Sequence, residues 1–153
     1  MPTKRLFEIE SRLDKVFCST GKITDDEIKS HLSRYLCVLT SGYIEESFKI
    51  IIQEYVKKRA NLNISNYIIS SSKQITNLNS EKIGVILNYF NSGWKDNFET
   101  EITEEEKDAI NSVLANRNLI AHGNNVGVSF VNVSTWYKYT KSVVLKIKNI
   151  VII

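Results

Sequence analysis

Residues 24–60 contain the longest run of regularly spaced apolar side chains in the chain. Apolar residues that recur at steps of three and four lie on one face of an α-helix. In this run they are Ile28, Leu32, Tyr35, Leu36, Leu39, Ile44, Phe48, Ile51, Ile52, Tyr55 and Val56. Thr24 and Glu27 form a capping box in front of the run and predict where the helix begins. We therefore expect one helix about 50 Å long, which the small residues 40–42 can bend.

Shorter segments with the same period occur on both sides of this run. They cover residues 3–18, 66–78, 81–90, 104–122 and 134–153. Asn63 or Ser65 is expected to cap the second segment and Ser80 the third, while Thr103 opens another capping box. Residues 91–101 are predicted to form a loop, and residues 124–134 a short extended or turn segment. The chain is thus predicted to be all-α, as an up-and-down bundle of five to six helices.

The composition agrees with a helical globular protein. Of the 153 residues, 42% are hydrophobic and 24% charged, with only 6 Gly and 1 Pro, which disfavours a disordered tail or an all-β sandwich. A chain of this length can bury a stable hydrophobic core without disulfides or metal ions, and we expect a single domain over residues 1–153. The formal net charge of +3 permits nucleic acid as a partner but does not by itself indicate one.

The cysteines and the hydropathy of the sequence argue against a disulfide-rich, a zinc-binding or a membrane-spanning protein. Cys18 and Cys37 show neither a CxxC spacing nor histidine partners at ligand spacing, so we expect reduced thiols and no metal or other cofactor. No apolar run approaches the roughly 18 residues of a membrane span. The sequence therefore predicts a soluble, cytoplasmic protein of prokaryotic type, without a membrane partner.

The stretch "NRNLIAHGNN", residues 116–125, carries the candidate chemistry. Asn118 and His122 are four positions apart and share one helix face, and the long side chain of Arg117 can swing back toward them. Gly123 is expected to end the helix, which leaves this spot near a loop and open to solvent. An imidazole moves protons near neutral pH, and a guanidinium clamps a phosphate through two hydrogen bonds. Such a pair suits phosphodiester cleavage without a metal.

Cleavage of this kind acts on RNA. The ribose 2′-hydroxyl attacks the neighbouring phosphorus while His122 moves a proton and Arg117 stabilises the developing charge, and the product carries a cyclic phosphate. The reaction profits from a base and an acid on opposite sides of the phosphorus, which a two-fold homodimer with two facing motifs would supply. The spacing is also common by chance, and a histidine at a helix end also serves as a partner of the helix dipole. The residues alone leave both interpretations open.

The motif and its context resemble a known family. "ANRNLIAHG", at the end of the penultimate long helix, is similar to the Arg-Asn-x-x-x-His motif of the HEPN superfamily. The long helix in "SHLSRYLCVLTSGYIEESFKIIIQEYVKKRA", the stretch "NRNLIAHGNNVGVSFVNVS" and the aromatic-rich last helix resemble the RiboL-PSP-HEPN branch. The resemblance covers nearly the whole chain. It implies a helical bundle, a homodimer with its active groove between subunits, and metal-independent endoribonuclease activity in toxin–antitoxin or antiviral defence.

The resemblance also implies roles for single residues. Arg117 corresponds to the phosphate-binding arginine, Asn118 to a polar residue that orients the site, and His122 to the catalytic histidine. One toxin branch continues the motif as His-x-Tyr, and a partner nucleotidyltransferase modifies that tyrosine; Asn124 stands here instead, which argues against such regulation. Glu45 corresponds to an acid after Ser-Gly in similar proteins and is predicted to orient Arg117 or His122 by a hydrogen bond. The alternative interpretation is that Glu45 is a solvated acid on the polar face of the helix.

Other polar residues are secondary candidates. Lys57, Lys58 and Arg59 close the long helix, where they favour the negative end of its dipole and are candidates for contact with the RNA backbone. His31 has no acidic or cysteine partner at ligand spacing and is expected to be an ordinary surface histidine.

Three functions follow as hypotheses. The first is a homodimeric HEPN-type endoribonuclease that acts as a toxin or defence effector, with an antitoxin or another defence protein as a candidate partner. The second is a non-catalytic module of the same fold that binds RNA or a protein. The third is a structural or antitoxin-like partner whose groove is filled by another protein, and it predicts no RNA affinity.

Overall fold

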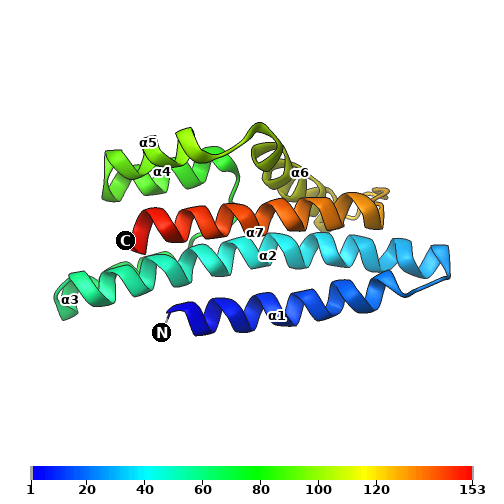
Figure 1. Ribbon diagram of the computed structural model, residues 1–153, viewed down its shortest axis with the longest axis horizontal. Helices are drawn as coiled ribbons and strands as arrows, with labels where there is room; N and C mark the ends of the chain where they lie inside the picture. Colours follow the sequence, from blue (N-terminus) through cyan, green and yellow to red (C-terminus); the bar gives the residue numbers. More distant parts are fainter. Residues whose placement is uncertain (1, 153) are drawn as a thin grey trace.

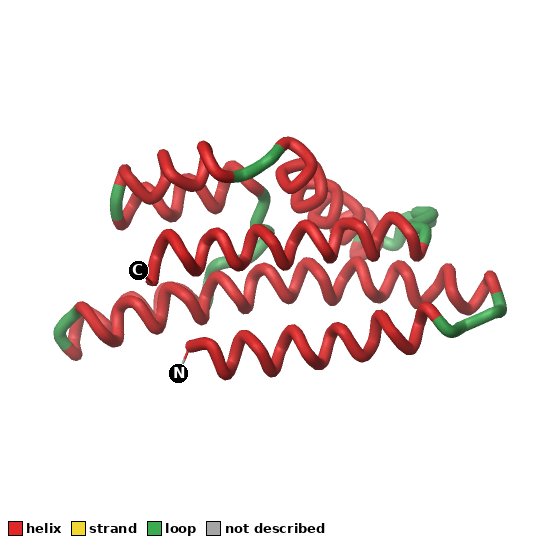
Figure 2. The backbone as a smooth tube through the Cα atoms, in the orientation of Figure 1, coloured by secondary structure: helices red, strands yellow, loops and turns green. Residues whose placement is uncertain are grey.

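The computed structural model describes residues 2–152, and in this range the chain forms seven helices and no strand (Figure 1). The helices are α1 (Pro2–Gly21), α2 (Asp26–Arg59), α3 (Leu62–Ser72), α4 (Ser80–Phe90), α5 (Ser92–Glu101), α6 (Glu104–Ala121) and α7 (Phe130–Ile152). The predicted all-α bundle is confirmed, although the count exceeds the expected five to six. The two longest connections join α3 to α4 and α6 to α7 (Figure 2).

Helix α5 lies where a loop was expected, and this prediction was wrong. Asn91 ends α4 and starts α5, since its N–H bonds to the Leu87 carbonyl and its side chain accepts from the N–H of Gly93 at 2.8 Å. Phe98 is almost completely buried, and the ring of Trp94 stacks on Phe90. Burial of Phe98 and packing of the partly buried Trp94, one turn earlier, therefore stabilise a helix whose sequence is otherwise polar.

Several helix ends also differ from the sequence prediction. Asp25, not Thr24, caps α2 by accepting from the N–H of Ile28. Asn61 caps α3 and Asn79 caps α4, in place of the residues expected for those roles. Helix α2 continues through residues 40–42 as one helix of 34 residues, and α7 begins at Phe130, inside the segment predicted to be extended.

Helix α2 is the central element of the bundle. It lies between α1 and α7, and the three helices run side by side (Figure 1). Ile50, Ile51 and Ile52 are all buried, and because successive helical positions point about 100° apart, α2 is enclosed on several sides at this level. Helix α6, which carries the quoted motif at its C-terminal end, packs on both α2 and α7.

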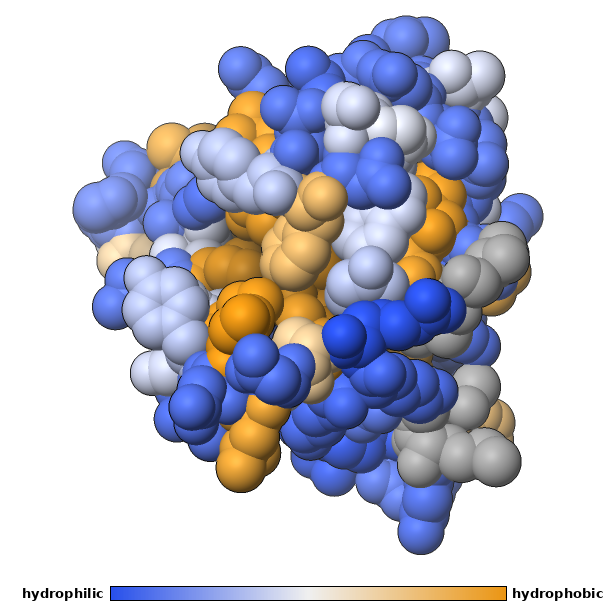
Figure 3. All heavy atoms as spheres, turned by 90° about the vertical axis from the view of Figure 1, so that its left-hand side faces the viewer, coloured by the Kyte–Doolittle hydropathy of each residue, from blue (hydrophilic) through white to orange (hydrophobic). Residues whose placement is uncertain are grey.

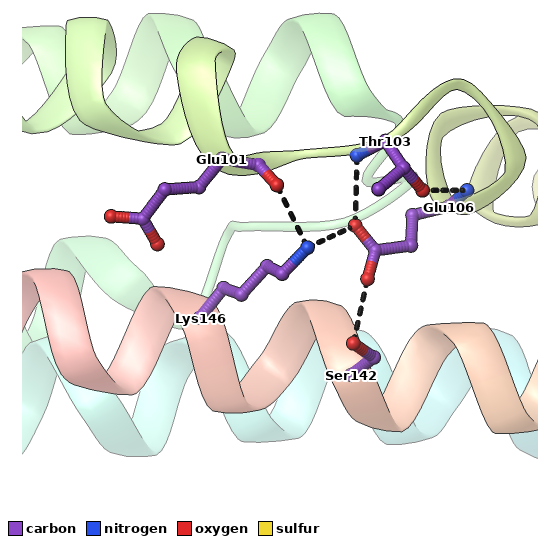
Figure 4. A network of polar contacts seen from close by, with 5 residues as sticks. All are labelled: Glu101, Thr103, Glu106, Ser142 and Lys146. Carbon is purple, nitrogen blue, oxygen red and sulfur yellow. Dashed lines mark hydrogen bonds and ion pairs between the residues drawn. The ribbon is translucent and has the colours of Figure 1, made fainter.

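A buried carboxylate fixes the start of α6 on α7 (Figure 4). Glu106 completes the predicted capping box: its side chain accepts from the Thr103 N–H at 2.9 Å, and its own N–H donates to the Thr103 hydroxyl. The same carboxylate accepts from Ser142 and Lys146 of α7, both at 2.6 Å. Burial raises the pKa of Glu106, but these hydrogen bonds outweigh it and lower the pKa below the ordinary 4.5.

Candidate functional site

The last turn of α6 exposes the histidine of the motif. His122 is the C-cap of α6, and its N–H bonds to the Asn118 carbonyl. Gly123 follows with φ +77°, its N–H bonds to the Ile120 carbonyl, and the next N–H bonds to the carbonyl of Leu119. These are the paired bonds of a Schellman motif, which turns the chain sharply away from the helix. The imidazole of His122 is therefore left at the surface, next to a fixed turn.

Arg117 is held by two side-chain amides. Its Nη1 donates to Oδ1 of Asn118 and to Oδ1 of Asn77, each at 3.1 Å. Asn77 belongs to the α3–α4 connection and has φ +54°, a left-handed conformation that asparagine tolerates better than most residues. The backbone N–H of Asn77 in turn donates to Oε1 of Glu45 on α2, at 2.9 Å. Glu45 therefore contacts Asn77, and through Asn77 it is linked to Arg117.

The α3–α4 connection is fixed on both sides of Asn77. Leu78, the next residue, is only 2% exposed and belongs to the core. Ser80, at the start of α4, donates through its N–H and its hydroxyl to Oδ1 of Asn111 on α6. The side chain of Asn77 thus projects from a loop that is tied to α6 one and a half to two turns before Arg117.

A second link joins α2 to the turn after His122. Arg34 donates through Nη1 to Oδ1 of Asn125 at 3.2 Å, and its Nη2 contacts Nδ1 of His31. Arg34 and Glu45 are about three helical turns apart and therefore lie on the same face of α2. The two links, one through Asn77 and one through Asn125, flank the end of α6. Sequence reasoning missed Arg34, although it lies on the same face of α2 as Glu45. It also gave His31 no acidic partner, which was wrong, because Oε1 of Glu27, four positions earlier, lies 3.9 Å from Nε2 of His31.

Residues 4–152 match the sequence profile described as RiboL-PSP-HEPN, which covers almost the entire chain. The chain belongs to the RiboL-PSP-HEPN family. This membership supports a HEPN-type module related to RNA. No curated protein and no solved structure matches the chain. No helix in residues 2–152 is long and apolar enough to cross a membrane, and these residues contain no cluster of three or more His, Cys, Asp or Glu side chains suited to a metal ion.

The basic end of α2 lies apart from the motif of this HEPN domain. Lys57, Lys58 and Arg59 are all exposed, and Lys57 is about 18 Å along the helix axis from Glu45, at about 1.5 Å per residue. The guanidinium of Arg59 lies over the ring of Tyr55, 5.9 Å from its centroid. The structure does not bring these cations together with Arg117. Figure 3 shows exposed apolar surface among hydrophilic side chains at this end of the molecule. On α3, the side chains of Leu62 and Ile64 are exposed.

An apolar groove lies between α1 and α2 of the HEPN domain, next to the face of α2 that carries Arg34 and Glu45. Its lining includes Ile9, Arg12, Leu13, Val16, Tyr35, Val38, Leu39, Gly42, Tyr43 and Glu46. Tyr35 is 54% exposed and Val38 37% exposed, which is unusual for large side chains in the middle of a central helix. Gly42 has no atom within 4 Å of the position that a Cβ would take. Tyr35 and Glu46 are the direct neighbours of Arg34 and Glu45, so the groove and the two links share one helix.

Proposed function

We propose that the protein is a metal-independent endoribonuclease of the HEPN type, in which Arg117 binds the scissile phosphate and His122 transfers a proton. The observation that carries the proposal is an exposed imidazole at a fixed helix end, five residues after a guanidinium that Asn77 and Asn118 orient. Family membership supports a role on RNA. A toxin or antiviral defence effector, restrained by an antitoxin or another defence protein, is the setting that we infer.

The proposed reaction is a transesterification within the RNA chain. The 2′-oxygen forms a bond to the adjacent phosphorus and gives its proton to one His122, while the bond from phosphorus to the 5′-oxygen breaks and that oxygen takes a proton from a second imidazole. Arg117 faces the phosphoryl oxygens, where negative charge grows in the transition state. The products are a 2′,3′-cyclic phosphate and a 5′-hydroxyl.

The hydrogen bonds of Arg117 suit this role. A guanidinium has five N–H groups, and the two on Nη1 face Asn118 and Asn77. The edge formed by Nε and Nη2 is geometrically suited to bind two oxygens of one phosphate. Since both partners of Nη1 are neutral amides, they orient the side chain without cancelling its charge.

The second imidazole would come from a second copy of the chain. The groove between α1 and α2 offers the exposed side chains of Tyr35 and Val38 to a partner, and Gly42 allows a close approach of another helix. Because Arg34 and Glu45 lie on the same helix as this surface, a two-fold dimer formed there would place two motifs near one groove. Asn118 orients Arg117 in each copy.

Cleavage of RNA tests the proposal directly. The purified wild type, Arg117→Ala, His122→Ala and the control Arg5→Ala would be incubated in EDTA with a mixed pool of structured and single-stranded RNAs, and the product ends analysed. We expect the wild type and Arg5→Ala to leave 2′,3′-cyclic phosphates, and the two motif variants to lose at least 100-fold in rate, on the order of a lost general base or charge-stabilising donor.

Two other outcomes would redirect the interpretation. RNA binding without cleavage by the wild type would favour the non-catalytic module of the same fold. Equal cleavage by wild type and His122→Ala would place the active site elsewhere in the preparation or the protein. An RNA with a 2′-deoxy group at the cleaved position should resist the enzyme, because the attacking hydroxyl is absent.

A further inference from the structure

We propose that Asn77 is a positioning residue for Arg117. Glu45 holds the backbone of Asn77 in place, and the side chain of Asn77 orients the guanidinium of Arg117 for the binding of a phosphate. The inference rests on the proposed function, because it concerns the phosphate-binding role of Arg117. Its basis is a continuous chain of contacts over three elements: Glu45 on α2, Asn77 in the α3–α4 connection, and Arg117 on α6.

The backbone conformation of Asn77 makes this bridge. Within residues 2–152 it is the only non-glycine residue with positive φ. Its backbone N–H points to Glu45 and its side-chain carbonyl to Arg117, so one residue faces two helices at once. Side chains with a short amide tolerate left-handed φ because they cost less steric strain there and bond locally. A β-branched or long apolar residue at this position would lose both the conformation and the acceptor.

An amide between the carboxylate and the guanidinium has an electrostatic advantage. If Glu45 contacted Arg117 directly, the ion pair would compete with phosphate for the same N–H groups and would offset the positive charge. Asn77 instead accepts a hydrogen bond from Arg117 through a neutral amide oxygen. The carboxylate of Glu45 accepts from the backbone N–H of Asn77 and not from Arg117. The guanidinium is thus oriented while its charge remains available to an anion.

Orientation matters because an arginine side chain loses much rotational freedom when it binds. A guanidinium whose Nη1 is already anchored loses less freedom on contact with phosphate, which strengthens binding without a new contact to the ligand. Removal of the Asn77 acceptor should therefore weaken RNA binding only as long as Arg117 is present.

Substitutions at Asn77 can separate the side chain from the backbone. Asn77→Gly keeps the left-handed conformation and the N–H to Glu45 but removes the acceptor for Arg117. Asn77→Asp keeps an acceptor and adds a charge that competes with phosphate. Thr76→Ala, in the same exposed connection, is the matched control. Each change would be made in a His122→Ala background, and affinity for a mixed-sequence single-stranded RNA oligomer measured with and without Arg117→Ala.

We expect the effects of the Asn77 substitutions and of Arg117→Ala on RNA affinity to be non-additive in this double-mutant cycle. Asn77→Gly and Asn77→Asp should weaken RNA binding about tenfold when Arg117 is present, in line with the loss of a hydrogen bond to a charged group, and less than about twofold when it is Ala. Thr76→Ala should leave affinity unchanged. An equal loss with and without Arg117, or no loss in either background, would overturn the positioning role.

A readout that needs no RNA separates this inference from the proposed function. In NMR spectra of the wild type and of Thr76→Ala, the Nε–H signal of Arg117 should be separate from the signals of freely rotating arginines. In Asn77→Gly it should move to the position of those signals. If RNA neither binds nor is cleaved but the signal behaves in this way, the proposed function fails and the positioning of Arg117 stands. A signal unchanged by Asn77→Gly rejects the positioning role itself.

Discussion

Arg34 on α2 donates a hydrogen bond to Asn125, three residues after His122, across 91 residues of sequence. The same guanidinium contacts His31, so two basic groups of α2 border the turn that carries the proposed catalytic histidine. These groups and the Glu45–Asn77–Arg117 chain flank the end of α6, so RNA bound at Arg117, as we propose, would pass near Arg34.

We therefore predict that Arg34→Ala weakens RNA binding irrespective of base sequence. Each phosphate contact on a single strand contributes about 0.7 to the slope of log affinity against log salt concentration, and the slope should fall by about this amount. The measurement is a salt titration of RNA affinity in a His122→Ala background. Arg34→Lys should retain the slope because it keeps the charge, as should Arg5→Ala on the exposed surface of α1. A slope unaffected by Arg34→Ala would remove this residue from the RNA path.

Gly42→Gln is predicted to convert the proposed dimer into a monomer without loss of stability. A side chain at this position meets no atom of its own chain within 4 Å, but it would block the approach of a partner helix. Loss of a glycine inside α2 also favours the helix by up to about 1 kcal/mol. Light scattering would give the oligomeric state and thermal unfolding the stability. A variant that remains dimeric at the wild-type dissociation constant would place the interface elsewhere.

Gly123→Ala is predicted to destabilise the protein by about 1 kcal/mol, because left-handed φ is costly for a residue with a Cβ. The Schellman turn after His122 would also be strained, and RNA cleavage should decrease in parallel. Gly127→Ala in the same connection is the control, since its Cβ meets nothing within 4 Å and its φ is not in the left-handed range. Urea unfolding of the three proteins tests the prediction; equal loss in both variants would contradict it.

Glu106→Gln should destabilise the bundle by about 3 kcal/mol near neutral pH, because it leaves Lys146 without its anionic partner at a largely buried position. The pKa of Glu106 is lowered in the folded state, so the charged carboxylate contributes stability above pH 4.5, and this contribution is lost as the pH falls through the lower folded pKa.

The difference in unfolding free energy between wild type and Glu106→Gln should accordingly shrink below about pH 4.5. Glu104→Gln, at an exposed ion pair with Lys107, is the control and should have little effect at any pH. A difference that does not change with pH would mean that shape, and not charge, accounts for the role of Glu106.

Cys37 is predicted to resist alkylation while Cys18 reacts. Cys37 is fully buried, its Sγ donates to the Val113 carbonyl, and burial raises its pKa to about 11, so it stays a neutral thiol at pH 8. Cys18 is exposed. Mass spectrometry after treatment with iodoacetamide should show one modified cysteine in the folded protein and two in denaturant. Rapid modification of both in the native state would show that α2 and α6 separate readily.

Local rules in the sequence predicted a large part of the fold. The apolar period gave α1, α2, α6 and α7 within a few residues, and the Thr103–Glu106 capping box is present as expected. Helix α5 was missed because its two core-facing aromatics, the partly buried Trp94 and the buried Phe98, form too short an apolar pattern to outweigh the polar residues around them. Its stability comes from packing on α4 and α7, which no local window contains.

The sequence by itself determined the helical bundle and the family, and it predicted that Arg117, Asn118 and His122 lie near one another, because a helix places residues about one turn apart on the same face. Of this group, the hydrogen bond between Arg117 and Asn118 is present. The tertiary structure alone decided what holds that group in place. Asn77 is 40 residues from Arg117, and Arg34 is 91 from Asn125, so their hydrogen bonds exist only because α2 and the α3–α4 connection both pack beside α6. Contacts over such separations depend on the relative placement of whole helices, which periodicity and capping signals do not specify.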